Sequence, residues 1–347
     1  MLRRHKKFLL ICTVAALLTL TVLSGCGKTT TSTQSGHNGQ EIKLVASTYV
    51  PPSYKDLYPS LSQFVDYVNE HGKGKVQVEF YDSGKLLGAE QALPGLMSGT
   101  ADIIVHTDSY ISGTHPILGI FEMPGVYKNF TDFRTKLTTG SPLVNLVNKD
   151  LAQHNLFILA VMPATEEYLW STKPVHSPAD LKGLRIRGAG RIENQYLASM
   201  GAATVVTSSA EIYESLERGT IDGMVSYVGT VPARSLQNVV KYATKVEMGH
   251  YAVEIFMKLD KWNSLPRDVQ DILMAAGKQY ETNSPELQLK VQNDEQWPAI
   301  TKAGVQVIEP NAAQLLEFQA AARPVQEWWQ KQLPGDLGQQ ALDLAKQ

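Results

Sequence analysis

The stretch that decides the fold runs from Asp180 to Gly223 and reads DLKGLRIRGAGRIENQYLASMGAATVVTSSAEIYESLERGTIDG. It opens with a short strand pattern, Leu184 to Arg187, followed by Gly188 and Gly190. Open α/β sheets bind ligands beyond the carboxyl ends of their strands, and Arg187 stands at such an end. Its planar guanidinium can hold a carboxylate through two parallel hydrogen bonds. Alternatively, because Arg185 and Arg187 share one strand face, either could pair with a surface carboxylate such as Glu193.

Strand and helix patterns alternate on both sides of this stretch. The N-terminal half predicts strands at 41–47, 76–80 and 103–105 and helices at 57–70 and 89–98. The second half predicts strands at 157–162, 184–187, 204–206 and 224–225 and helices at 192–200 and 210–218. This order is typical of α/β folds with mostly parallel sheets. The length favours two lobes.

A short internal echo links the two halves. Ala89-Glu90 opens a helix that ends in Gly99-Thr100-Ala101-Asp102, and Ala210-Glu211 opens one that ends in Gly219-Thr220-Ile221-Asp222. In both, the glycine can close the helix before an apolar strand. Chance similarity of helix ends is the alternative, but the shared order favours two related lobes.

After Tyr251 the sequence becomes mainly helical. Helices are predicted at 262–280, 285–302 and 312–332, the last interrupted by Pro324, with a strand at 305–308. A long helical segment after two α/β lobes could brace both of them.

The N-terminus has the pattern of an export signal. A basic segment containing Arg3 and Lys7 precedes an apolar run from Phe8 to Leu23, which is of signal-peptide length. Leu23-Ser24-Gly25-Cys26 resembles the lipobox of bacterial lipoproteins, which implies cleavage before Cys26 and a diacylated thiol. An uncleaved anchor or a plain secretory signal is the alternative. Residues 29–40 are polar and read as a flexible tether.

Composition excludes several classes of protein. The chain has two cysteines, Cys12 and Cys26, so the mature chain would have no thiol for a disulfide or a cysteine nucleophile. Loss of residues 1–25 would remove four basic and no acidic residues and shift the net charge from −2 to −6. That balance argues against nucleic-acid binding.

Motifs for catalysis, metals and cofactors are not found. There is no GxSxG elbow, P-loop or HExxH, and Gly188-Ala189-Gly190 lacks the third glycine of a dinucleotide site. The residues therefore indicate no enzyme class, and we expect no cofactor and no metal. Polar and aromatic side chains at the ends of predicted strands are candidate ligand contacts, with capping or core packing as the alternative. They are Tyr49, His106, Thr107, Asp108, Tyr110, Tyr168, Trp170, Tyr227 and His250.

Several spaced blocks resemble the DctP-type solute-binding proteins of TRAP transporters. The blocks are Asp180-Leu181-Lys182-Gly183 with Arg187, Met200-Gly201-Ala202, Glu211 to Leu216, Gly219 to Gly223, Leu87-Gly88-Ala89-Glu90, Gly99 to Ile103 and Phe121 to Gly125. The resemblance covers about residues 41–310. It implies a two-lobed periplasmic-binding-protein-like α/β fold with mixed sheets, crossover segments and a long lobe-spanning helix.

The resemblance also implies a function. A small organic acid would bind between the lobes, its carboxylate clamped at the Arg187 position, with Ser226 and His250 matching other cleft positions. The loaded protein would deliver the acid to a membrane permease driven by a cation gradient. Extracytoplasmic binding proteins that feed a sensor kinase or an ABC transporter, and a secreted α/β enzyme, are the alternatives.

One departure from the family pattern bears on the ligand. Many relatives carry a second arginine where this chain has Thr165-Glu166-Glu167. The loss of a cation and the gain of two carboxylates, Glu166 and Glu167, predict a monocarboxylate, aromatic or bearing an amine, instead of a C4-dicarboxylate.

The resemblance also suggests domain boundaries. Residues 1–25 form the signal and 26–40 the tether, and 331–347 are a C-terminal tail. Lobe 1 takes 41–165 with about 252–292, and lobe 2 takes 166–251 with about 293–330.

Overall fold

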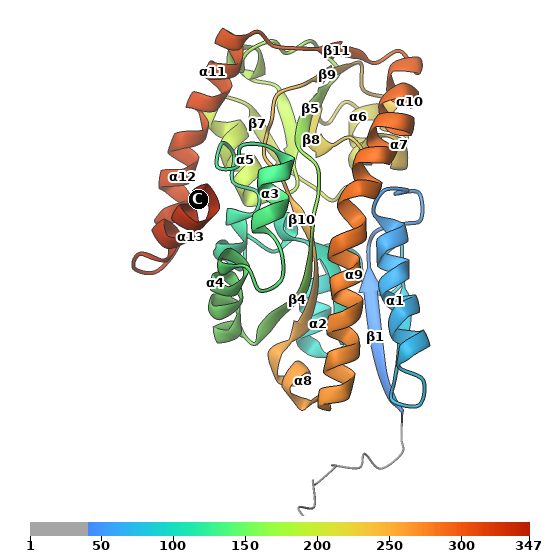
Figure 1. Cartoon of the computed structure of the whole chain (residues 1–347). Helices are drawn as coiled ribbons and strands as arrows, with labels where there is room; N and C mark the ends of the chain where they lie inside the picture. Colours follow the sequence, from blue (N-terminus) through green and yellow to red (C-terminus); the bar gives the residue numbers. More distant parts are fainter. Residues whose placement is uncertain (1–40) are drawn as a thin grey trace, which may run out of the picture. The chain divides into compact units, whose positions relative to one another are not determined.

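Two mixed β-sheets organise residues 41–347, the part of the chain that the computed structural model describes (Figure 1). The proposed signal, lipidation site and tether all lie outside these residues. The first sheet has the order β2-β1-β3-β10-β4, with β1 Ile42–Thr48, β2 Val76–Tyr81, β3 Ile103–Thr107, β4 Leu156–Pro163 and β10 Ala252–Lys258. The second has the order β11-β9-β5-β8-β6-β7, with β5 Glu167–Ser171, β6 Arg185–Gly188, β7 Ala203–Val206, β8 Gly223–Tyr227, β9 Tyr242–Thr244 and β11 Gln306–Ile308.

Helices flank both sheets. The first sheet and its helices are called lobe 1, and the second sheet and its helices lobe 2. The α-helices are α1 Tyr58–His71, α2 Ala92–Ser98, α3 Phe130–Lys136, α4 Pro142–Leu151, α5 Arg191–Ser199, α6 Ile212–Glu217, α7 Thr230–Ala233, α8 Leu259–Ser264, α9 Arg267–Val291, α10 Trp297–Lys302, α11 Ala312–Ala320, α12 Ala322–Gln330 and α13 Leu337–Lys346. Short 3-10 turns include η1 Asp108–Tyr110 and η2 Pro116–Ile120, and η6 Gln292–Gln296 is a π-helical turn.

Local sequence pattern explains two strands of lobe 1, the edge strand β2 and the central strand β3. In β2 the side chains of Val76 and Val78 are buried while Gln77 and Glu79 are exposed, which confirms the strand predicted from alternation. Strand β3 is buried at every position, as expected for a continuous apolar run between two neighbouring strands.

The sheets are less parallel than the alternation of strands and helices predicts. Strand β10 is antiparallel to both β3 and β4, and β5 is antiparallel to both β8 and β9. Each of these strands follows a segment that joins the lobes, at residues 164–166 for β5 and 245–251 for β10. The chain therefore enters each sheet in the sense opposite to its neighbours.

The echo between the halves is a real structural repeat. Gly99 and Gly219 both have positive φ, 82° and 64°, at the ends of α2 and α6. Three residues later, Asp102 exchanges two hydrogen bonds with Val45, through its backbone N–H and its carboxylate. Asp222 makes the same pair of bonds with Arg185. The Gly-Thr-x-Asp sequence thus ends a helix and ties the chain to a neighbouring strand in both lobes.

One long helix replaces the break that the sequence pattern predicts near residues 281–284. Helix α9 continues through Pro285 to Val291, then passes through η6 into α10. It packs on α1 and β4 of lobe 1, and α10 packs against α7 of lobe 2. Figure 1 shows this continuous orange segment running along both lobes.

The C-terminal segment is more than a tail. Helix α12 packs on α5 of lobe 2, and α13 returns to α4 of lobe 1. Ala341, Leu342 and Ala345 of α13 are buried. Residues 331–347 therefore complete the packing of lobe 1 and are not the tail that the sequence predicted from their position beyond the stretch that resembles the family.

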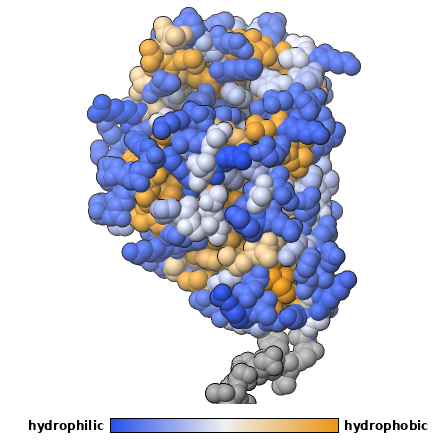
Figure 2. All heavy atoms as spheres, in the orientation of Figure 1, coloured by the Kyte–Doolittle hydropathy of each residue, from blue (hydrophilic) through white to orange (hydrophobic). Residues whose placement is uncertain are grey.

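On the face of the molecule in Figure 2, hydrophobic patches are separated by polar residues. Within residues 41–347, no helix combines the length and the apolar character needed for a membrane crossing.

Candidate functional site

Arg187 lies at the end of β6, between β7 and β8, and its side chain is buried. Its Nε donates to the Thr207 carbonyl at 2.9 Å and its Nη1 to the Val225 carbonyl at 3.3 Å. Its Nη2 donates to the Tyr110 hydroxyl at 3.2 Å. These bonds hold the guanidinium in one orientation, and each terminal nitrogen keeps a second N–H.

The charge of Arg187 has no acidic partner among residues 41–347, because no carboxylate of that part of the chain forms a salt bridge with it. Arg185, two residues earlier, is exposed and paired with Asp222 at 3.0 Å. A buried charge is costly unless it is paired. The contrast marks Arg187, rather than Arg185, as the anion-binding candidate.

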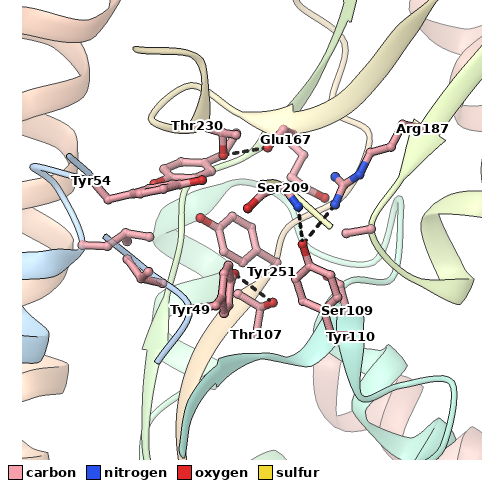
Figure 3. A pocket seen from close by; sticks show the side chains of 15 residues that line it. Tyr49, Tyr54, Thr107, Ser109, Tyr110, Glu167, Arg187, Ser209, Thr230 and Tyr251 are labelled. Carbon is pink, nitrogen blue, oxygen red and sulfur yellow. Dashed lines mark hydrogen bonds between the residues drawn. The ribbon is translucent and has the colours of Figure 1, made fainter. Parts of the chain in front are cut away.

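The Arg187 side chain faces a cavity between the lobes (Figure 3). The cavity has a volume of about 30 Å³. The cleft is therefore nearly closed, and a ligand must enter through lobe opening. It is lined by Tyr49, Val50, Tyr54, Leu57, Thr107, Ser109, Tyr110 and Tyr251 together with Glu167, Arg187, Ala189, Ser209, Ser226, Tyr227 and Thr230.

Five tyrosines, Tyr49, Tyr54, Tyr110, Tyr227 and Tyr251, line the cavity. The Tyr110 hydroxyl, carried by η1 of lobe 1, accepts from Arg187 and also from the Ser209 backbone N–H at 2.9 Å, so it bridges the lobes. The rings of Tyr54 and Tyr227 are stacked, with centroids 6.3 Å apart, and Tyr251 lies 5.1 Å from Tyr227. Burial raises the pKa of Tyr49, Tyr227 and Tyr251 well above the usual range, so these phenols stay neutral.

Seven of the residues proposed from sequence line this cavity. They are Tyr49, Thr107, Tyr110, Glu167, Arg187, Ser226 and Tyr227. Their common feature is a position at or just beyond a strand end, where an α/β sheet exposes side chains to a ligand.

His106 and Asp108 stand behind the wall instead of lining it. His106 stacks on Tyr110, its Nε2 bonds the Ala89 carbonyl at 2.7 Å, and its Nδ1 accepts from the Thr107 N–H. Burial lowers the pKa of His106 to about 4, so the ring is neutral. The Asp108 carboxylate accepts from the backbone of Ser109 and Ala252. Both residues support the wall.

Tyr168 and Trp170 lie on the face of β5 that points away from the cavity. Successive side chains of a strand point to opposite faces, and Glu167 of β5 takes the cavity face. Trp170 is fully buried, stacks on Trp297 and donates to the Ser226 carbonyl at 2.7 Å. Tyr168 also packs on Trp297. The structure therefore places both in the packing of lobe 2.

Glu166 and His250 are also outside the cavity. Glu166 precedes β5, and its carboxylate accepts from the Phe130 N–H at 3.1 Å. His250 is fully buried against Phe133 and Tyr127, with ring centroids 4.6 and 5.8 Å away. Burial lowers its pKa to about 3, which keeps the ring neutral. The resemblance assigned His250 to the cleft, and the structure places it in the core.

Sequence reasoning missed several cavity residues that lie outside the strands. Tyr54, Ser109, Ser209, Thr230 and Tyr251 line the site. Ser209 follows the strand pattern at 204–206 and could have been found by the rule applied to Arg187. A further cation, Arg234, stands at the rim with its guanidinium over the Tyr54 ring, 5.4 Å from the centroid, and donates to the Ser209 hydroxyl.

A set of buried carboxyl groups lies at and behind the Arg187 site: Asp108, Glu122, Glu167, Glu193 and Glu254. Burial is the main cause that raises the pKa of each, and repulsion within the set adds to it for most of them. Within residues 41–347 no group of three or more His, Cys, Asp or Glu could hold a metal ion. The raised pKa values favour the protonated, neutral form of these carboxyl groups.

This set predicts an inverse dependence of stability on pH. Raised pKa values mean that the folded state binds more protons than the unfolded state, so the free energy of unfolding falls as pH rises from the unfolded values through the folded ones. Chemical denaturation of the ligand-free protein between about pH 7 and pH 8 should show this decline, because His106 and His250, whose lowered pKa values act in the opposite sense at lower pH, are neutral in both states there. A stability that rises over that range would contradict the protonated state of the set.

The comparisons with known proteins agree with the fold and the site. Residues 47–332 match DctP, the bacterial extracellular solute-binding protein family 7, and the chain belongs to this family. A solute-binding protein of Albidiferax ferrireducens is 27% identical over 267 residues, which cover 75% of this chain and 77% of that protein.

Solved structures share the two-lobed architecture. A TRAP periplasmic solute binding protein from Desulfovibrio salexigens with bound orotic acid has a TM-score of 0.81 at 21% identity, covering 88% of this chain and 97% of its own. Another, from Shewanella oneidensis with bound succinate, has a TM-score of 0.80 at 16% identity, covering 89% and 100%. Members of the family are extracytoplasmic receptors for small organic acids that work with TRAP permeases.

Proposed function

We propose that this protein captures a small organic acid between its lobes, with the acid's carboxylate on Arg187, and delivers it to a TRAP permease. The observation that carries the proposal is the buried Arg187 guanidinium without an acidic partner in residues 41–347. Backbone carbonyls and Tyr110 already orient its donors. A ligand carboxylate would supply the missing negative charge through charge-assisted hydrogen bonds.

The charges of the cavity favour a ligand with one carboxylate. Arg187 is the cation among the cavity-lining residues of the described chain, and Glu167 is the acid. Arg234 lies at the rim, where Tyr54 and Ser209 engage its donors. A second ligand carboxylate inside the cavity would meet tyrosines and Glu167, so a dicarboxylate is disfavoured.

Ligand binding is expected to select the closed arrangement of the lobes. Tyr110 of lobe 1 touches both Arg187 and the Ser209 backbone of lobe 2. A carboxylate bound to Arg187 would therefore lie beside the Tyr110 hydroxyl, which reaches Arg187 only when the lobes meet. Such differential contact is what allows a ligand to shift an open–closed equilibrium.

A thermal-shift panel of organic acids tests the ligand class. We expect monocarboxylates to raise the melting temperature by mass action and C4-dicarboxylates to leave it unchanged. Mass spectrometry of acids released from the purified protein would identify the natural ligand. Stabilisation by succinate, malate or fumarate alone would refute the single-carboxylate assignment.

The proposal includes a lipid anchor on Cys26, which lies outside the described residues. Its basis is the lipobox-like Leu23-Ser24-Gly25-Cys26 after an apolar run, since two or more acyl chains give stable membrane attachment. Cells expressing the full chain should incorporate labelled palmitate into the protein, and Cys26→Ser should abolish the label. Equal labelling of both forms would disprove the anchor.

A further inference from the structure

Glu167 is the acidic side chain that lines the same cavity as Arg187. It is the first residue of β5 and pairs across the sheet with Tyr227 of β8. Its side chain lines the cavity, and Figure 3 shows Glu167 and Arg187 reaching toward the same space. Arg187 acts on the ionisation of Glu167 although the two groups form no salt bridge. The cavity therefore holds a guanidinium and a carboxyl group that are not paired with each other.

The carboxyl of Glu167 also lacks a protein partner. Glu167 is only 4% exposed, and its Oε2 has no hydrogen-bond partner within residues 41–347. An unsatisfied buried carboxyl is costly, and a ligand donor would remove that cost. The Tyr251 hydroxyl, which also lines the cavity, is unsatisfied in the same part of the chain.

The surroundings of Glu167 favour a cation. Glu193, Glu122 and Asp108 all raise its pKa, after burial as the largest cause, whereas Arg187 lowers it. A ligand cation beside Glu167 would relieve this repulsion and stabilise the carboxylate form. Tyrosine faces also attract cations, and Tyr54, Tyr227 and Tyr251 form the adjoining wall.

We infer that the ligand is a zwitterion, with its carboxylate on Arg187 and a positively charged nitrogen held by Glu167 and the tyrosine wall. The inference rests on the proposed function and narrows it to a chemical class. Glu167 and Arg187 line the same small cavity, so a ligand that contacts both carries its two charges within one small molecule. Amino acids and their N-methylated relatives have this arrangement.

Matched pairs of acids that differ in the charged nitrogen test the inference by calorimetry. Suitable pairs are proline with cyclopentanecarboxylate, pipecolate with cyclohexanecarboxylate, and glycine betaine with 3,3-dimethylbutanoate. We expect the wild-type protein to prefer a zwitterion over the analogue that lacks the charged nitrogen by about 10- to 100-fold, which for proline and pipecolate is the effect of a hydrogen bond to a charged group.

The variant Glu167→Gln should reduce that preference to about threefold or less, because it keeps the size of the side chain and removes its charge. The control Glu166→Gln changes the neighbouring carboxylate, which lies outside the cavity and bonds the Phe130 N–H, and should leave the preference unchanged. Circular dichroism checks that both variants are folded.

The outcomes separate this inference from the proposed function. Equal binding of both members of every pair, an unchanged preference in Glu167→Gln, or binding of other acids but of no zwitterion would overturn the zwitterion class while leaving an acid receptor. If neither zwitterions nor other acids bind, the proposed function itself fails.

Discussion

Replacement of Arg187 by alanine is expected to abolish most ligand affinity while the protein remains folded. Truncating one member of a buried charge pair costs about 2–5 kcal/mol, which corresponds to a roughly 30- to 5,000-fold rise in Kd. Arg187→Lys should recover little of this loss, because an ammonium cannot bond the Thr207 and Val225 carbonyls and still present two N–H groups to a carboxylate. Calorimetric titration with the acid that gives the largest thermal shift measures the effect.

Arg185→Ala provides the matched control on the same strand. Arg185 is exposed, and its guanidinium bonds Asp222. Its loss should cost at most about 1 kcal/mol of stability and leave Kd unchanged, since exposed ion pairs contribute little. An Arg187→Ala variant that binds its acid as tightly as the wild type would show that the carboxylate is held elsewhere.

The fold was largely predictable because local patterns and the repeat agreed. The alternation of Val76 to Phe80 identified an outer strand, and the Gly-Thr-x-Asp echo marked equivalent helix ends in the two lobes. The sequence did not reveal that α9 continues through Pro285. A proline normally interrupts a helix, but here Tyr280 and Gln288 on the adjoining turns pack and bond against β10 and Pro163. Tertiary packing overrides the local signal.

The site was only partly predictable for two physical reasons. The rule that ligands meet strand ends found Arg187, Tyr110 and Tyr227, but it does not say which face of a strand points into the cleft. Strand β5 was not recognised, so Trp170 could not be assigned to the face opposite Glu167. Burial was also invisible in the sequence, and it makes His250 a neutral core residue.

Gly190→Ala is expected to hold the lobes apart. Gly190 precedes α5 in lobe 2, with extended backbone that any residue can adopt. A Cβ there would lie 2.4 Å from the Ser109 carbonyl oxygen and 2.9 Å from the Ser109 Cα of lobe 1. Backbone atoms cannot move aside as a flexible side chain can. The clash therefore exists only in the closed arrangement, and opening relieves it without unfolding either lobe.

The variant should thus lose affinity because closure, rather than the carboxylate contact, is impaired. We expect Kd to rise by about tenfold or more, because the binding-competent closed state of the protein becomes a minor population. Small-angle scattering should show an open form even at saturating ligand. Gly188→Ala is the control, since the atoms nearest to its added Cβ belong to the Asn194 side chain of its own lobe. Wild-type affinity and ligand-induced compaction in Gly190→Ala would show that binding does not require Ser109 and Gly190 to meet. The contact through Tyr110 would then be the one that couples ligand binding to closure, because it joins Arg187 and Ser209 of lobe 2 to lobe 1.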